Sequence, residues 1–249
     1  MKFLRFALFL AVAALLLPSS SWAASPGAGL IGTSHDFAGK GSPATGLCTF
    51  CHTPHKALST LLLWNHTLST NTFSWDVPAT TAGTVFPTFK GDTYKGPSAK
   101  CLSCHDGTVA VGDIAWFAEG KPSILDNTKH DSGKFNIAST SGSMKGNHPV
   151  AMPYPYLNAK NTYNGSTTGA GAELAEWQAT PLSPVRIFND DGSGNITAGA
   201  VAAKTGLECS SCHDPHNRAT VDDLFLRGTL GGNTSGVGAT YICLKCHIK

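Results

Sequence analysis

The sequence repeats one five-residue pattern, Cys-x-x-Cys-His, at residues 48–52, 101–105, 209–213 and 243–247, and it has no other cysteine. The two thiols of this pattern are spaced to bond the two vinyl groups of a porphyrin, and the histidine that follows can reach the iron. The pattern therefore predicts four covalently bound c-type haems. Their attachment residues would be Cys48, Cys51, Cys101, Cys104, Cys209, Cys212, Cys243 and Cys246.

Paired cysteines have two other common uses, as disulfides in exported proteins and as zinc ligands. Disulfides need no histidine, and zinc-binding motifs usually place their histidine several residues away. Here a histidine directly follows every second cysteine, which favours haem attachment over both alternatives. The proximal iron ligands would then be His52, His105, His213 and His247.

The remaining six histidines are the main candidates for the second axial position of each iron. Only Met144 and Met152 could compete with them, because Met1 belongs to the predicted signal peptide described below. Histidine on both faces fills all six positions of the iron and leaves no site for a substrate. We therefore expect an electron-transfer protein with no catalytic residues.

Local sequence distinguishes four of these histidines as distal ligands. His55 and His216 each lie three residues after a proximal histidine whose haem is already fixed, so each should bind a different iron. His148 precedes a proline, which favours an extended backbone. His35 precedes Asp36, whose carboxylate could orient the imidazole.

The last two histidines have other possible roles. His66 follows Trp64 and Asn65, and it could be either a ligand or a packed histidine beside a buried tryptophan. His130 stands between Lys129 and Asp131 in a polar stretch, so we expect it to be solvent-exposed.

The first 23 residues have the pattern of a secretory signal peptide, in which Lys2 and Arg5 precede an apolar run and Ala23 ends a cleavage site. The apolar run is shorter than the roughly 20 residues of a membrane-spanning helix, and no later segment approaches that length. We expect an exported protein without a membrane span, either extracellular or periplasmic. Residues 24–249 would form one haem-binding domain.

Charged residues make up 14% of the chain, with 18 basic and 16 acidic side chains, which is unlike the basic footprint of a nucleic-acid binder. Glycine, serine, threonine and asparagine are frequent between the motifs, which indicates loops. We therefore expect a mostly irregular multihaem fold, with short helices at the motifs, few short strands and a core built around four haems. Residues 172–178 could form a further helix.

Residues 188–196 have alternating oxygen-bearing side chains like those of a calcium loop. Ala200 stands where such a loop needs a bidentate glutamate, so we expect a polar turn between two strands instead.

The ordered combination of motifs resembles the extracellular multihaem cytochromes of metal-reducing bacteria, specifically the tetrahaem type that polymerises into filaments. The resemblance extends over the mature chain, although residues 106–208 have few landmarks. It rests on Ser34-His35-Asp36-Phe37, Cys51-His52-Thr53-Pro54-His55, Leu63-Trp64-Asn65, Cys101-Leu-Ser-Cys-His-Asp-Gly-Thr108, Asn147-His148-Pro149-Val150, Cys209-Ser-Ser-Cys-His-Asp-Pro-His216 and Cys243-Leu-Lys-Cys-His247.

This resemblance implies closely packed haems in alternating parallel and perpendicular pairs, with little secondary structure. It also implies a homopolymer in which a histidine of one subunit ligates a haem of the next, and His35 is the position we carry over for that role. The partners would be other redox proteins or extracellular electron acceptors. Three alternatives stay open: a discrete carrier, a subunit that docks on a membrane complex, and a multihaem oxidoreductase, which would need an iron with an open face.

Overall fold

The computed structural model describes residues 27–38, 46–55, 57, 61–77, 79–80, 83–109, 111–114, 136–138, 141–169, 172–221, 224–230 and 240–248. The predicted signal peptide and His130 lie outside these residues. None of the helices in the described part of the chain is long and apolar enough to cross a membrane.

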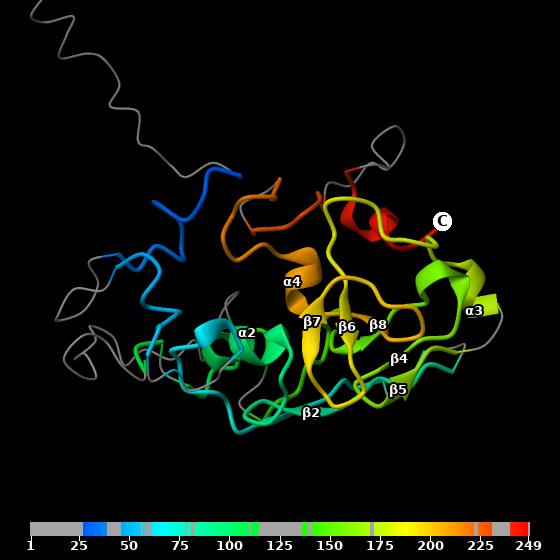
Figure 1. Cartoon of the computed structure of the whole chain (residues 1–249), viewed down its shortest axis with the longest axis horizontal. Helices are drawn as coiled ribbons and strands as arrows, with labels where there is room; N and C mark the ends of the chain where they lie inside the picture. The colour runs from blue at the N-terminus through cyan, green and yellow to red at the C-terminus, as the bar shows by residue number, and fades with distance from the viewer. Residues whose placement is uncertain are drawn as a thin grey trace, which may run out of the picture.

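The largest element is a four-stranded antiparallel sheet with the strand order β3-β8-β6-β7 (Figure 1). Its strands are β3 (Met152–Pro153), β6 (Phe188–Asp190), β7 (Ile196–Ala198) and β8 (Thr205–Leu207). Met152 pairs with Leu207, and Phe188 pairs with both Ala198 and Gly206. The polar segment between β6 and β7 joins two strands, as the sequence predicted.

Two further antiparallel pairs lie outside this sheet. Strand β1 (Thr72–Phe73) pairs with β2 (Phe89–Lys90), and β4 (Thr162–Tyr163) pairs with β5 (Ser166–Thr167). All of these strands are two or three residues long.

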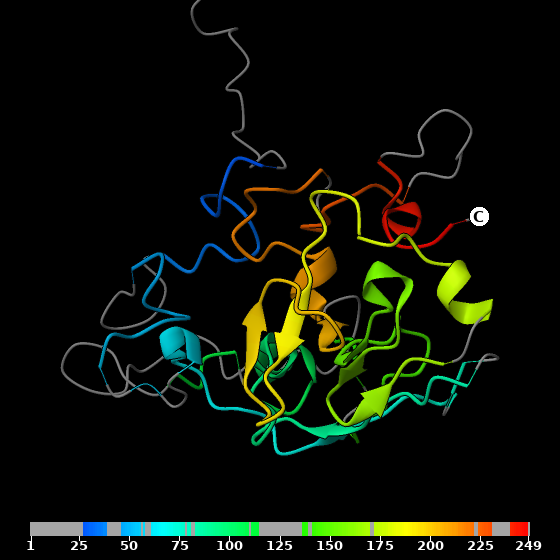
Figure 2. The same ribbon diagram turned by 45° about the vertical axis from the view of Figure 1, so that its right-hand side comes forward.

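The helices are short, and the longest, α2 (Pro97–His105), begins with proline in its first turn, where the missing N–H costs no hydrogen bond. The next is α4 (Cys209–Cys212), which begins with a capping box between Glu208 and Ser211. Helices α2 and α4 pack against each other, as Figure 2 also shows. The others are η1 (Leu61–Leu63), η2 (Tyr156–Asn158), α3 (Ala172–Ala175) and η3 (Ile242–Lys245), and α3 is shorter than the expected helix at residues 172–178.

The expectation of a mostly irregular fold with a core built around four haems is wrong. The described chain is organised by β-structure, with a four-stranded antiparallel sheet, two strand pairs and few helices. No group of three or more His, Cys, Asp or Glu side chains within the described ranges is arranged to hold a metal ion. The strands escaped the sequence analysis because two or three residues cannot display an alternating pattern.

The core of the described chain consists of side chains in three clusters. The first lies between α2 and the β1–β2 pair and includes Phe73, Leu102 and Met144. The second joins Tyr154, Trp177, Leu207 and Cys246, and the third joins Tyr163, Phe188 and Ile196 across the sheet. Both methionines that could have competed for iron are buried, with Met144 in the first cluster and Met152 in β3.

Candidate haem-attachment and histidine sites

The attachment motifs form single helical turns, whether or not they belong to a longer helix. The second motif occupies the end of α2, and the third begins with α4. In the first, third and fourth motifs, the histidine N–H donates to the carbonyl of the first cysteine over 2.9–3.0 Å. A helical turn places the two thiols, three residues apart, on the same side. All eight thiols are free in this structure.

The second and third motifs meet where α2 packs on α4. The thiols of Cys101 and Cys209 hydrogen-bond to each other, and this contact is the main reason that the pKa of Cys101 lies well above its ordinary value. The two residues are the first cysteines of their motifs. Porphyrins bonded at these two motifs would therefore be neighbours.

The other consecutive motifs are also near one another. Burial raises the pKa of Cys51 to about 12, and the neighbouring thiol of Cys104 in the second motif adds to this shift. Burial likewise raises the pKa of Cys212 to about 11, with contributions from Cys209 and from Cys243 of the fourth motif. The four motifs thus neighbour one another in their sequence order.

Three pairs of histidines share a spacing that fits a metal between them. A metal held between two imidazoles lies about 2 Å from each nitrogen, and each ring centroid lies about 1.2 Å further, so the centroids are roughly 6 to 6.5 Å apart. Each pair combines one proximal histidine with one of the expected distal histidines. The centroid separations are 6.1 Å for His35–His105, 6.2 Å for His52–His216 and 6.5 Å for His148–His247.

Hydrogen bonds orient several of these rings. The Nδ1 atom lies 2.6 Å from the Leu62 carbonyl oxygen in His52, 3.3 Å from that of Pro215 in His35 and 2.8 Å from that of Pro149 in His148. A carbonyl only accepts, so Nδ1 donates and Nε2 keeps its lone pair. Histidine ligands of metals usually have this arrangement.

His66 differs from the paired histidines in its hydrogen bonding. It is 1% exposed, its Nε2 lies 2.7 Å from the Val111 carbonyl oxygen, and its Nδ1 lies 3.2 Å from that of Thr67. Both ring nitrogens therefore face carbonyl groups. His66 is thus buried against two carbonyl oxygens, and its role as a ligand stays a prediction.

Two histidines of the motif regions have no partner at the metal-bridging spacing within the described residues. The proximal His213 is exposed, and its Nδ1 donates to the Leu224 carbonyl over 2.8 Å. His55 is also exposed, and its backbone hydrogen-bonds to the Thr53 hydroxyl. One proximal and one distal histidine are thus left over.

The loops after the first and third motifs form the same structure. The proximal histidine of each donates from Nδ1 to a leucine carbonyl, in Leu62 and in Leu224. The residue after each proximal histidine also donates its N–H to the residue after that leucine. Thr53 N–H donates to Leu63 O, and Asp214 N–H donates to Phe225 O, both over 2.8 Å.

The match continues into the side chains that close the two loops. The backbone N–H of Asn65 donates to Cys51 O, and its side chain donates to Thr49 O over 2.8 Å. Arg227 makes the equivalent contacts, from its backbone to Cys212 O and from Nε to Ser210 O over 3.3 Å. His55 and His216 consequently occupy equivalent positions in the two loops.

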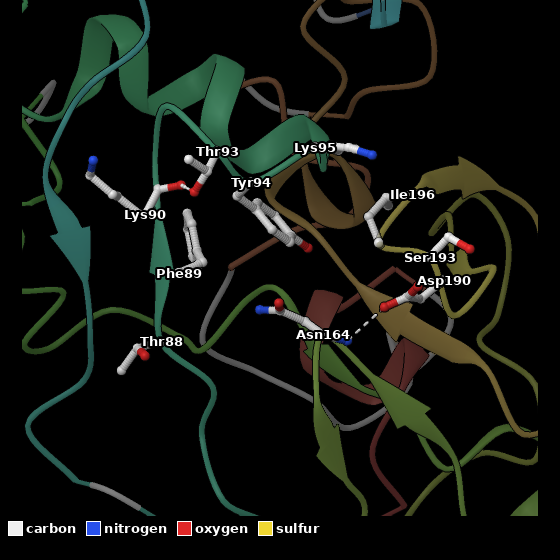
Figure 3. A pocket seen from close by; sticks show the side chains of 11 residues that line it. Thr88, Phe89, Lys90, Thr93, Tyr94, Lys95, Asn164, Asp190, Ser193 and Ile196 are labelled. Carbon is white, nitrogen blue, oxygen red and sulfur yellow. Dashed lines mark hydrogen bonds between the residues drawn. The ribbon is translucent and has the colours of Figure 1, made fainter.

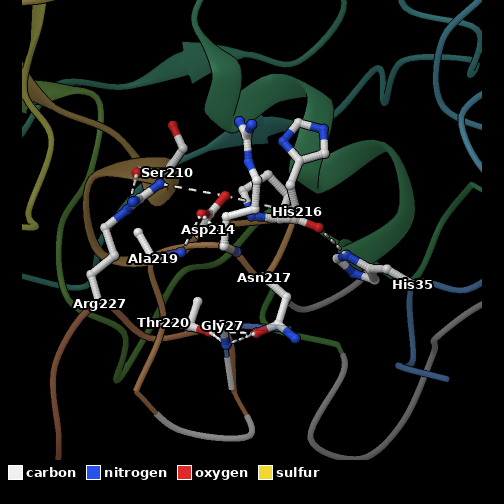
Figure 4. A network of polar contacts seen from close by, with 11 residues as sticks. Gly27, His35, Ser210, Asp214, His216, Asn217, Ala219, Thr220 and Arg227 are labelled. Carbon is white, nitrogen blue, oxygen red and sulfur yellow. Dashed lines mark hydrogen bonds and ion pairs between the residues drawn. The ribbon is translucent and has the colours of Figure 1, made fainter. Parts of the chain in front are cut away.

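Asp214, which directly follows the proximal His213, organises the third loop and was missed by the sequence analysis (Figure 4). Its carboxylate accepts from the backbone N–H groups of Ala219, His216 and Arg218 over 2.9–3.2 Å and lies 3.6 Å from Nη2 of Arg227. Burial alone would raise the pKa of Asp214, but these contacts outweigh it and lower the pKa. The Cys-His-Asp sequence, which recurs at buried Asp106, was the available signal.

Hydrogen bonds hold the N-terminal segment against this loop (Figure 4). The Gly27 N–H donates to Oδ1 of Asn217 over 3.1 Å, and Nδ2 of Asn217 donates to Gly29 O over 2.8 Å. This attachment brings His35 to Pro215 and His105. Burial, together with the adjacent His105, lowers the pKa of His35 to about 4, so its imidazole is neutral at neutral pH and can act as a ligand.

Comparison with known proteins gives no family for the chain. No family model matches it, and no curated protein does so.

Proposed function

We propose that the chain is a tetrahaem c-type cytochrome that transfers electrons. The observation that carries this proposal is the one-to-one matching of three proximal histidines with three distal histidines, each at a spacing that fits a metal. Random packing of ten histidines gives no reason for every such pair to contain one histidine of each kind. The four attachment motifs, which contain every cysteine, support the same proposal.

The chain's own residues would bind and enclose the cofactor. The eight thiols form the thioether bonds, and the paired imidazoles occupy both axial positions and exclude other ligands. When bound, each haem supplies an iron that exchanges one electron. Because paired imidazoles leave no position for a substrate, they favour a carrier over an oxidoreductase. The sequence-order contacts between motifs would hold neighbouring cofactors together.

We propose further that the protein forms a head-to-tail homopolymer, in which His55 of one subunit pairs with His213 of the next. His216 reaches the first motif of its own chain, and His55 is its structural equivalent in the first loop. A contact from the first loop to the third motif of another copy would therefore continue the same alternation. Such a heterologous contact propagates into an open filament.

His35 does not have this role in the proposed polymer. Its ring lies beside His105 of the same chain, and its segment is fixed to the loop that follows the third motif. The predicted signal peptide supports a location outside the cytoplasm, either extracellular or periplasmic. The partners would be other redox proteins or extracellular electron acceptors.

Two measurements test the electron-transfer proposal on protein produced in a host that attaches c-type haem. Mass spectrometry should find four haems per chain, and near-infrared magnetic circular dichroism should show bis-histidine low-spin iron. A chain without bound haem would refute the proposal. Persistent high-spin iron that binds carbon monoxide would instead favour an oxidoreductase.

Electron microscopy of wild type and a His55→Ala variant tests the polymer. The wild type should form filaments, whereas His55→Ala should remain monomeric with one of four haems high-spin. His130→Ala is the matched control, because His130 is the other unassigned histidine. Filaments of His55→Ala with four low-spin haems would contradict the assignment, and loss of filaments in His130→Ala alone would transfer the role to His130.

A further inference from the structure

A buried carboxylate lies at the junction of α2, α4 and the sheet. Glu208 follows β8, directly precedes the first cysteine of the third motif and is 0% exposed. Its Oε1 accepts from the hydroxyls of Tyr94 and Tyr163 over 2.5 and 2.6 Å. Its Oε2 accepts from the backbone N–H and the hydroxyl of Ser98 over 3.0 and 2.5 Å.

These four contacts stabilise the ionised form of Glu208. Burial raises the pKa of Glu208, and the hydrogen bonds from Ser98, Tyr163 and Tyr94 oppose that shift without cancelling it, so the carboxylate is ionised above a raised pKa. The Ser98 hydroxyl also receives the N–H of Cys209 over 3.0 Å, so its own proton is directed at the carboxylate. Hydrogen bonds to the charged form of a group stabilise that form.

The charge of Glu208 has no partner cation within the described part of the chain, where no lysine or arginine nitrogen lies within 4 Å of it. Lys100 is near enough to interact with it, but the Lys100 ammonium donates to the Lys95 carbonyl over 3.4 Å. Asp214 provides the contrast, because Arg227 lies 3.6 Å from its carboxylate. Above its raised pKa, Glu208 is thus a buried, hydrogen-bonded negative charge without an ion pair in this part of the chain, and Lys100 is a cation that interacts with it.

Solvent screens this charge poorly. Figure 3 shows a surface cavity, about 320 Å³ in volume, with the half-buried ring of Tyr94 on its wall. The Tyr94 hydroxyl donates to Glu208, so the phenol lies between the cavity and the carboxylate. Charges interact more strongly in such an environment than across water.

The same carboxylate lies beside two attachment sites. The hydrogen bond with Cys209, burial, and then the charges of Cys209 and Glu208 raise the pKa of Cys101. The hydrogen bond with Cys101 lowers the pKa of Cys209, and the charge of Glu208 opposes this shift. The residues in the equivalent position before the first and fourth motifs, Leu47 and Ile242, are uncharged.

We propose that Glu208 is a fixed negative charge that keeps the reduction potentials of the haems at the second and third motifs below those of the other two. An iron that gains an electron becomes more negative, and a nearby unscreened anion opposes this change. Glu208 would therefore act on the haems through its charge alone, without contacting the iron. This inference rests on the proposed tetrahaem function.

The test is a spectroelectrochemical titration of the four midpoint potentials of the holoprotein at pH 8. Glu208→Gln preserves the shape of the side chain and removes its charge. Two of the four midpoint potentials should then rise by at least about 59 mV, which is a tenfold change in the ratio of reduced to oxidised haem. Glu176→Gln removes an exposed charge after α3 and should leave all four unchanged. Tyr163→Phe keeps the charge and should move the potentials by less than a third as much.

The inference fails if Glu208→Gln leaves all four potentials in place or raises them equally, or if Tyr163→Phe shifts them as much. The wild type gives a second test that requires no variant to fold. Its potentials should separate into a low and a high pair, and the separation should persist in 1 M salt, where the Debye length is about 3 Å. Failure of the proposed function is distinguishable, since that protein would have no haem spectrum to titrate.

Discussion

The His35 imidazole lies 6.1 Å from the His105 imidazole, centroid to centroid, and its Nδ1 faces the Pro215 carbonyl. The ring is therefore located by two distant parts of the chain, α2 and the loop after the third motif. This relationship makes the predicted ligand of one motif dependent on the folding of another.

We expect His35→Ala to open one axial position in the holoprotein. One haem in four should become high-spin and should bind carbon monoxide, while the other three retain the bis-histidine spectrum. Magnetic circular dichroism and carbon monoxide titration measure the two quantities. An unchanged spectrum would show that His35 is not the ligand at the second motif.

Asn217→Ala should produce part of the same effect from a distance. The variant loses the side-chain contacts to Gly27, Gly29 and Thr220. The N-terminal segment is then held less firmly, by Gly29 N–H to the Asn217 carbonyl and Gly27 N–H to the Thr220 hydroxyl. We expect a loss of about 1–3 kcal/mol in the free energy of unfolding, because buried polar partners are left unpaired. A fraction of one haem should also become high-spin. Asn195→Ala, which changes an exposed contact with Asp191, should do neither.

His66→Gln should affect stability and leave the haem spectrum unchanged. The buried imidazole lies between two carbonyl oxygens and, when neutral, donates its one N–H to one of them. Its replacement should lower the free energy of unfolding by about 1–3 kcal/mol, measured by guanidinium titration. Appearance of a high-spin haem in this variant would make His66 a ligand after all.

The buried pair of Asp214 and Arg227 gives a prediction about stability. Their side chains are 2% and 1% exposed, so Arg227→Met would leave a buried carboxylate without its cation. Loss of one partner of such a pair costs about 3–5 kcal/mol. The double variant with Asp214→Asn should be destabilised by less than the two single effects together, as a double-mutant cycle would measure. Additive effects would contradict coupling between the two groups.

Glu208 should make the stability depend on pH. Because the pKa of Glu208 is raised in the folded state, the folded protein retains this proton at pH values where the unfolded chain, with a pKa of about 4.3, has lost it. Its contribution to stability is therefore full below about pH 4 and is lost as the pH rises through the folded pKa. Tyr94, Tyr163, Cys101, Cys209 and Lys100 face the same region.

Guanidinium unfolding from pH 4 to pH 8 measures this effect, and Glu208→Gln should have a flatter profile than the wild type. Glu176→Gln is again the matched control, since its side chain is exposed. Identical slopes for Glu208→Gln and wild type would contradict the assignment.

The sequence predicted chemical groups of the site, but not the fold around them. Contiguous motifs predicted the attachment cysteines and the proximal histidines, and these roles stay predictions. Of the predicted distal ligands, His35, His148 and His216 lie beside proximal histidines, whereas His55 has no such neighbour within the described residues. Which histidines become neighbours depends on how distant parts of the chain pack together, and no local pattern encodes that packing. The packing of His66 likewise depends on Val111, on a distant segment.

Other features had no sequence signal that could be separated from noise. The strands are too short for periodicity, and the turn between β6 and β7 was predicted only because its glycines and acids are concentrated. The repeated loop was hidden because its second copy has one extra residue between the proximal histidine and the leucine, and because Asn65 is replaced by Arg227. Single acids such as Glu208 resemble surface residues until the fold buries them.

The docking of the N-terminal segment on Asn217 imposes an order in time. If the predicted signal peptide exports the chain N-terminus first, His35 would emerge early, but the residues that hold it would emerge only with the last quarter of the chain. His216, which lies beside His52, would likewise emerge only late. If the proposed haems are bound, the axial pairs at the first two motifs would therefore be completed late, after export of the third motif, and the machinery that attaches haem would meet these early motifs while each still has only its own histidine.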